Sequence, residues 1–116
     1  MALVKTLQAG VPETLSAMAG TGAITGQVWG IPPGHSRGVT GRTLTIQITF
    51  SADPGAFVYN LMSSLDGVNF ILLNTTDVSK TTSPVLAQIP VNVIQVRLDQ
   101  VSKANSVTAT PILMIA

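Results

Sequence analysis

A strict alternation of apolar and polar side chains between residues 43 and 51 is the strongest constraint on the fold. Leu44, Ile46, Ile48 and Phe50 alternate there with threonine, glutamine and serine. Successive side chains of a β-strand point to opposite faces, so a period of two is typical of a strand that is buried on one face. A helix would instead place its apolar residues three or four positions apart. The segment therefore predicts a half-buried strand.

Turn sequences and further alternation predict more strands after this one. Asp53-Pro54-Gly55 has the composition of a turn, because proline presets the bend and glycine tolerates a positive φ. Phe57 and the apolar residues at two-residue spacing after it indicate a second strand. Asp66-Gly67 is the strongest hairpin signal in the chain. We expect the return strand at residues 68–73 and a polar loop at residues 74–83.

The C-terminal half of the sequence predicts three more strands. Residues 84–89 form a weak candidate between Pro84 and Pro90, which favours an edge position. Alternation around Val96 predicts the next strand, followed by a turn at residues 101–105. The last strand begins near residue 107, and Pro111 in its middle favours an edge strand or a β-bulge.

The N-terminal region shows no clean period. We interpret residues 1–23 as a loosely ordered arm, of a kind often tied down by a neighbouring subunit, and residues 24–116 as a single β-sandwich domain. Deleting residues 1–20 should then leave the fold intact. Residues 25–31 predict a short strand that carries Val28 or Trp29 inward. A lone tryptophan is either a core residue or an interface contact, and the core is the more common place.

Short strands at roughly ten-residue spacing, without a long helical period, predict an antiparallel β-sandwich or barrel. Composition adds that the surface is poor in charge: charged residues make up 9% of the chain, against roughly 25% in ordinary domains. The net charge of +1 argues against long-range electrostatic capture of nucleic acid or of an anionic membrane. A surface with so few ions favours self-association, so we expect an oligomer.

The sequence offers little catalytic chemistry. It has no cysteine, and His35 is its one histidine. Residues 34–38 match the G-x-S-x-G pattern of a nucleophile elbow around Ser36. The flanking prolines and glycines, however, supply neither the strand nor the helix that this motif requires. Asp66 with Asn69 offers too few oxygen atoms for calcium, which takes six to eight. We expect no enzyme activity, no cofactor and no metal site.

The hairpin sequence Ser64-Leu65-Asp66-Gly67, followed by Phe70 and by leucines, carries a resemblance. It is similar to small β-sandwich virion proteins of tailed bacteriophages, a likeness that extends over roughly residues 20–116. The resemblance implies a jelly-roll or immunoglobulin-like sandwich of about six to eight strands with an extended N-terminal arm. It also implies a capsid decoration (cement) protein, made in the host cytoplasm, that sits on the capsid exterior as a homotrimer.

On this hypothesis the partners are the major capsid protein lattice and other copies of the chain, with no nucleic acid and no membrane. The lattice contact is assigned to residues 1–42. The candidate partner-binding residues are Leu3, Val4, Lys5, Leu7, Trp29, Arg37 and Arg42. Two alternatives stay open. A head or tail fibre adaptor would have a similar sequence, and related hairpins occur in carbohydrate-binding sandwiches, for which Trp29 and Tyr59 are the candidate contacts.

Overall fold

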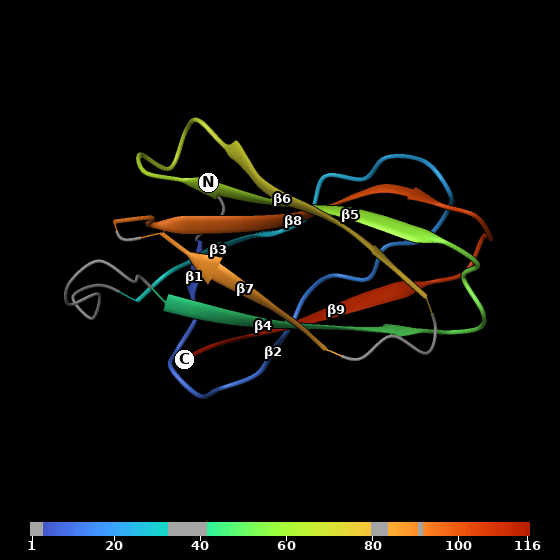
Figure 1. Cartoon of the computed structure of the whole chain (residues 1–116), viewed down its shortest axis with the longest axis horizontal. Coiled ribbons are helices and arrows are strands. Elements are labelled where there is room, and N and C mark those ends of the chain that lie inside the picture. Colours follow the sequence, from blue (N-terminus) through green and yellow to red (C-terminus); the bar gives the residue numbers. More distant parts are fainter. Residues whose placement is uncertain (1–3, 33–41, 80–83, 91) are drawn as a thin grey trace.

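The computed structural model describes residues 4–32, 42–79, 84–90 and 92–116, and these form two β-sheets that face each other (Figure 1). One sheet has the strand order β1-β3-β8-β5-β6, and the other has the order β2-β9-β4-β7. The described residues contain nine strands and no helix, so the predicted all-β, sandwich-like class is confirmed. The finer assignment, jelly-roll or immunoglobulin-like, stays a prediction.

The strand bounds show which predictions hold. The five-stranded sheet consists of β1 (Lys5–Thr6), β3 (Val28–Gly30), β8 (Gln95–Lys103), β5 (Phe57–Ser64) and β6 (Ile71–Val78). The four-stranded sheet consists of β2 (Glu13–Thr14), β9 (Ala109–Ile115), β4 (Arg42–Phe50) and β7 (Val85–Ile89). Every strand pair is antiparallel except β1 with β3. The predicted strand between residues 43 and 51 is β4, and the predicted edge strand before Pro90 is β7.

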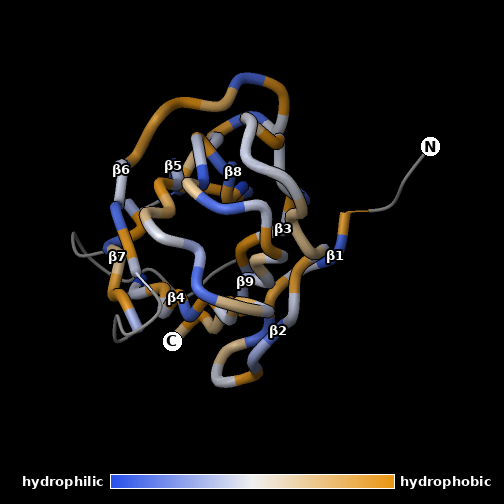
Figure 2. Tube along the Cα trace, turned by 90° about the vertical axis from the view of Figure 1, so that its right-hand side faces the viewer, coloured by the Kyte–Doolittle hydropathy of each residue, from blue (hydrophilic) through white to orange (hydrophobic). Residues whose placement is uncertain are grey.

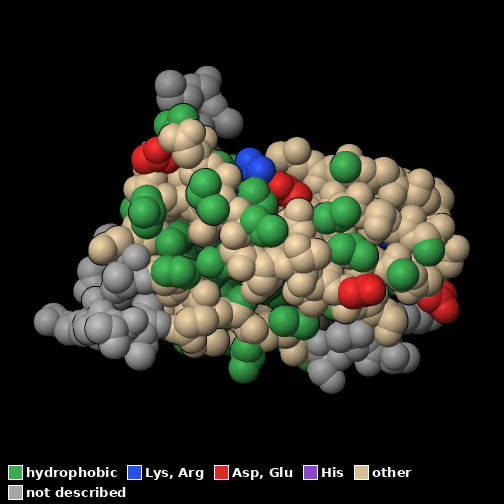
Figure 3. Space-filling model, turned by 45° about the horizontal axis from the view of Figure 1, so that its top comes forward, with side chains coloured by type: hydrophobic (Ala, Val, Ile, Leu, Met, Phe, Trp, Pro, Cys, Tyr) green, Lys and Arg blue, Asp and Glu red, His purple; other side chains and the backbone are tan. Residues whose placement is uncertain are grey.

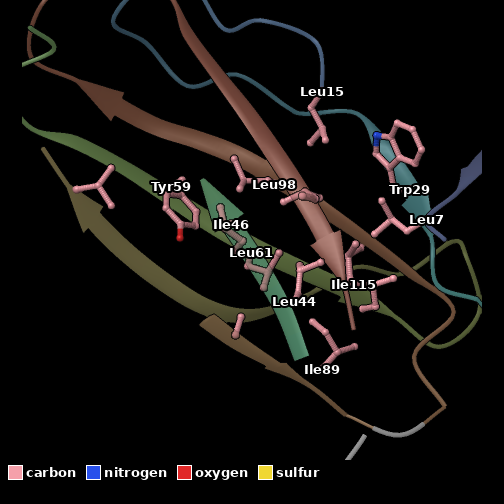
Figure 4. Close-up of a cluster of buried hydrophobic side chains, with 14 of the residues drawn as sticks. Leu7, Leu15, Trp29, Leu44, Ile46, Tyr59, Leu61, Ile89, Leu98 and Ile115 are labelled. Carbon is pink, nitrogen blue, oxygen red and sulfur yellow. The ribbon is translucent and has the colours of Figure 1, made fainter. Parts of the chain in front are cut away.

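The core lies between the two sheets and is built by the alternation that the sequence shows (Figure 4). Leu44 and Ile46 of β4 point inward, while Thr43 and Thr45, which alternate with them, are only half-buried. On the facing sheet Phe57, Tyr59 and Leu61 of β5 are completely buried. β4 and β5 therefore each bury one face, as the apolar residues at every second position predict.

The β5–β6 hairpin differs from the prediction in where its second strand begins and ends. β6 begins at Ile71 rather than residue 68, and it continues to Val78 through the segment predicted as a loop. The turn is longer because the Asp66 carboxylate accepts the backbone N–H groups of Val68 and Asn69 and keeps both residues out of the ladder. The polar residues 74–77 suit a strand that lies at the edge of its sheet.

Two predictions near the C-terminus are also wrong. β8 continues to Lys103, a buried residue, where a turn was expected. β9 lies inside its sheet, between β2 and β4, although Pro111 favoured an edge. The Pro111 carbonyl accepts the backbone N–H of Leu15 on the β2 side. N–H and C=O of one strand residue point the same way, so the missing donor of the proline leaves the β4–β9 ladder intact.

The described part of the N-terminal segment belongs to the sandwich. β1 pairs with β3 and β2 pairs with β9, on the side opposite β6 and β7 (Figure 2). Leu7, Leu15 and Met18 are buried in the core. This segment is therefore not the loosely ordered arm that was expected, and deleting residues 1–20 would remove core side chains. Sequence periodicity missed it because single anchors separated by exposed residues form no regular pattern.

Side chains of β8 hold the end of this segment in place. The Lys103 ammonium donates to the Met18 carbonyl at 2.8 Å and to Gln100 Oε1 at 3.1 Å. Gln100 in turn donates from Nε2 to the carbonyls of Gly20 and Gly22. The described residues 18–22 are thus fixed by hydrogen bonds to two buried polar side chains.

Candidate partner-binding surface

The turn of the β5–β6 hairpin is held by a dense set of hydrogen bonds around one carboxylate. Asp66 Oδ1 accepts the backbone N–H groups of Val68 and Asn69, both at 2.8 Å, and Oδ2 accepts the Asn69 side-chain amide at 2.7 Å. The buried Ser64 hydroxyl donates to Asp66 Oδ1 and accepts the N–H of Gly67. Gly67 has φ +79°, a conformation that favours glycine. The turn is thereby fixed in one shape.

These donors also determine the charge state of the turn. The backbone N–H groups of Asn69 and Val68, followed by the side chains of Asn69 and Ser64, hold the pKa of Asp66 well below its usual range. Asp66 is ionised at neutral pH and its oxygens are occupied by N–H donors. N–H groups aimed at a carboxylate are the wrong environment for a cation, so the geometry argues against calcium at Asp66 and Asn69.

Large apolar side chains project from this rigid turn and from the strand that follows it. Leu65 is 67% exposed, Val68 78%, Ile71 68% and Leu72 51%. Hydrophobic side chains also gather at this end of the molecule in Figure 3, on its left-hand side. We call Leu65, Val68, Ile71 and Leu72 the hairpin patch. Exposed apolar residues are ordinary when scattered, whereas four within eight positions concentrate exposed apolar surface on one hairpin.

The base of the hairpin is supported from the neighbouring strand β8. The Arg97 guanidinium lies 4.7 Å from the centroid of the Phe70 ring, within the range of a cation–π contact. Arg97 also forms a two-pronged ion pair with Asp99, with contacts of 2.9 to 3.1 Å. Asp99 accepts the N–H of Gly26 as well. The Arg97 charge is therefore already neutralised by Asp99.

The partner-binding residues predicted from the sequence do not form one surface. Val4 and Lys5 are exposed at the β1 end of the sheet, whereas Leu7 is fully buried. Leu3 and Arg37 lie outside the described residues, as do His35 and Ser36. Sequence reasoning missed the hairpin patch because Leu65 and Val68 flank the turn motif, and a turn motif predicts a bend without predicting which neighbouring side chains stay exposed.

Trp29 and Arg42 are both buried inside the protein. Trp29 is 3% exposed and belongs to the core, which favours the core alternative, and its Nε1 has no hydrogen-bond partner. Arg42 is also buried, and it donates from Nε to the Ala116 carbonyl and from Nη1 to the Pro32 carbonyl. Neither side chain is available to a partner in this conformation.

Two other kinds of site are absent from the described residues. No group of three or more histidine, cysteine or carboxylate side chains there could hold a metal ion. Within the same ranges, no helix is long and apolar enough to cross a membrane.

The fold places the chain among all-β proteins built from two facing sheets. No model of a known protein family and no curated protein sequence matches it. The chain is similar to the crystal structure of the SPBc2 prophage-derived protein YomS, with a TM-score of 0.54 and 15% sequence identity. The match covers 95% of this chain and 99% of that chain. At this identity the likeness shows a shared fold.

Proposed function

We propose that the chain is a non-enzymatic structural protein of a bacteriophage virion that docks onto other protein subunits through the hairpin patch. The exposure of Leu65, Val68, Ile71 and Leu72 on a hydrogen-bonded turn carries this proposal. Burying one such side chain contributes about 1.5–3 kcal/mol. A turn that is already rigid loses little conformational entropy on binding. The virion setting is supported by the resemblance of the hairpin sequence and by the fold shared with a prophage-derived protein.

Within the virion we propose capsid decoration. A protein that binds the assembled shell but not its loose subunits stabilises the shell by mass action. The partners on this proposal are the major capsid protein lattice and other copies of the chain, on the capsid exterior. Self-association is included because the charged fraction is 9%. The hairpin patch replaces residues 1–42 as the proposed lattice contact, and the exposed Val4 and Lys5 form a secondary contact.

The carbohydrate-binding alternative has less support. Sugar binding commonly uses exposed aromatic rings, but Trp29 and Tyr59 are buried in the core. Phe57 is buried as well, and Phe50 and Phe70 are half-buried. No aromatic side chain in the described ranges, which include all five of the chain, offers an open stacking face.

The proposal is tested by co-sedimentation of the purified chain with particles of the phage that carries its gene, assembled without that gene. The double variant Leu65→Ser, Val68→Ser should weaken binding at least about tenfold, because it removes apolar area worth more than 1.4 kcal/mol. Leu86→Ser is the matched control, since Leu86 is 70% exposed on β7, outside the hairpin. Equal binding by the double variant and the wild type would contradict docking through the patch.

Separating heads from tails before sedimentation tests the finer assignment. Binding to tailless heads supports capsid decoration. Binding to isolated tails or fibres, with none to heads, would replace decoration by the adaptor function.

A further inference from the structure

We propose that the open edge of β6 is a self-association surface, on which a second copy of the chain lays its own β6 antiparallel and extends the five-stranded sheet. This deepens the proposed function, on which it rests for the expectation of self-association, by assigning that contact to residues 74–78 of β6, outside the hairpin patch. Three features support this surface: the differences between the four sheet edges, the composition of β6, and the partly covered core beneath it.

The four edges differ in how well they are protected against pairing with another strand. β1 and β2 are two residues long, and short edge strands offer little to pair with. β7 has five residues and lies between Pro84 and Pro90, which lack backbone donors. β6 has eight residues and, in the described part of the chain, pairs with β5 alone. One long edge is thus left open.

β6 carries few of the residues that protect natural sheet edges. It contains no proline, lysine or arginine, and Asp77 is its single charged residue. A β-bulge at Leu73 interrupts the ladder with β5, but residues 74–78 keep a regular register, from Asn74 opposite Leu61 to Val78 opposite Phe57. On the side away from β5, alternate residues of this segment direct backbone groups that pair with no described strand, enough for a short intermolecular ladder.

The described residues also leave the core beneath this edge incompletely covered. A small pocket between β6 and β7 is lined by apolar side chains of both sheets, among them Ile48, Phe50 and Val85, which are half-buried. Tyr59 lines the same pocket, and its hydroxyl points toward β6 (Figure 4). That hydroxyl is buried without a hydrogen bond of good geometry. An added strand beside β6 would place alternate side chains over this pocket.

The charge pattern favours a second copy of the chain as the occupant. Two copies of β6 related by a two-fold axis pair antiparallel, and each contributes the same surface. An axis through Thr75 or Thr76 places Asp77 opposite an uncharged residue of the other copy, so like charges do not face each other across the strands. The net charge of +1 adds little repulsion between whole molecules. The geometry therefore predicts a dimer rather than the trimer that the resemblance implies.

The test is sedimentation velocity of the full chain from about 1 μM to about 500 μM, a range that detects dissociation constants from micromolar to near-millimolar. We expect a monomer–dimer equilibrium. Thr75→Lys places two ammonium groups near the two-fold axis and should weaken dimerisation at least about tenfold. Gln47→Lys adds the same charge on an exposed position of the inner strand β4 and should leave dimerisation unchanged.

A second variant and a second measurement separate pairing from side effects. Thr75 donates a hydrogen bond to Asn60 Oδ1 at 2.7 Å, so Thr75→Val, which loses this bond without adding charge, should still dimerise. Backbone amides in residues 74–78 should exchange more slowly as concentration rises. A monomer at all concentrations, a trimer, or an unchanged dimer in Thr75→Lys would overturn the proposal. The hairpin double variant should dimerise normally, so failure of one proposal leaves the other distinguishable.

Discussion

At the scale of single residues, Lys103 is the most unusual side chain of the chain. It is 2% exposed, and its ammonium donates to two oxygen atoms and lies 5.9 Å from the centroid of the Phe57 ring. No carboxylate of the described residues lies within ion-pair distance of it. Burial without a counter-charge lowers the pKa of Lys103 below its ordinary value.

This lowered pKa predicts a specific dependence of stability on pH. Between the folded-state pKa of Lys103 and its ordinary value of 10.5, the unfolded chain binds more protons than the folded chain. The free energy of unfolding should therefore rise with pH across this window. The raised pKa of Tyr59, which results from burial and is partly offset by Thr76, acts in the opposite direction above pH 10.

The measurement is urea unfolding of the wild type and of Lys103→Met at neutral pH and near the top of this window. Raising the pH should increase the free energy of unfolding of the wild type relative to that of the variant, because only the wild type has a buried ammonium that loses its charge in this window. The contribution of Tyr59 and the loss of the two hydrogen bonds cancel in this comparison. The same pH dependence in both proteins would show that the charge on Lys103 is not destabilising.

At the scale of strands and turns, predictability from the sequence follows local regularity. β4 alternates strictly, β5 has an apolar residue at every second position, and both strands are long and bounded by recognisable turns, so their residues were assigned correctly. The predicted range of β6 began too early, because the start of this strand depends on hydrogen bonds to Asp66 that exist only in the folded turn. Pro111 led to the wrong prediction of an edge position for β9, because a proline in the sequence shows that a backbone donor is missing but not which side of the strand lacks it. The hairpin patch depends on exposure, which alternation alone does not give.

The N-terminal segment provides a test at this scale. Leu15 is 3% exposed, and its backbone N–H donates to the Pro111 carbonyl at 2.8 Å. Leu15→Ala should lower the free energy of unfolding by about 2–5 kcal/mol, the usual cost of truncating a core leucine. Gln8→Ala, at an exposed position nearby, should change it by no more than about 0.5 kcal/mol. Thermal and urea unfolding measure both. A Leu15→Ala effect as small as the control would instead support a detachable arm.

At the scale of the whole molecule, the chain is compact and its surface has few charged residues. Its radius of gyration is 13.8 Å, close to the roughly 13 Å expected for a folded domain of this length. The described residues contain one ion pair, Arg97 with Asp99, and residues 65–78, which include the hairpin patch and β6, carry two charges, Asp66 and Asp77. Association through these surfaces depends on apolar burial and backbone hydrogen bonds rather than on attraction between charges.

This distribution predicts that assembly is insensitive to salt. Raising sodium chloride from about 0.05 M to about 0.5 M shortens the screening length several-fold and weakens exposed ionic contacts. The dissociation constants of the dimer and of the particle complex should change by less than about threefold, because no ionic contact has to form. Sodium sulfate should tighten both, since it strengthens the burial of apolar surface. The same sedimentation measurements at several salt concentrations give these constants. A tenfold loss of affinity in sodium chloride would show that charged residues make the contact, and would shift the assignment toward Lys5 and the other basic residues.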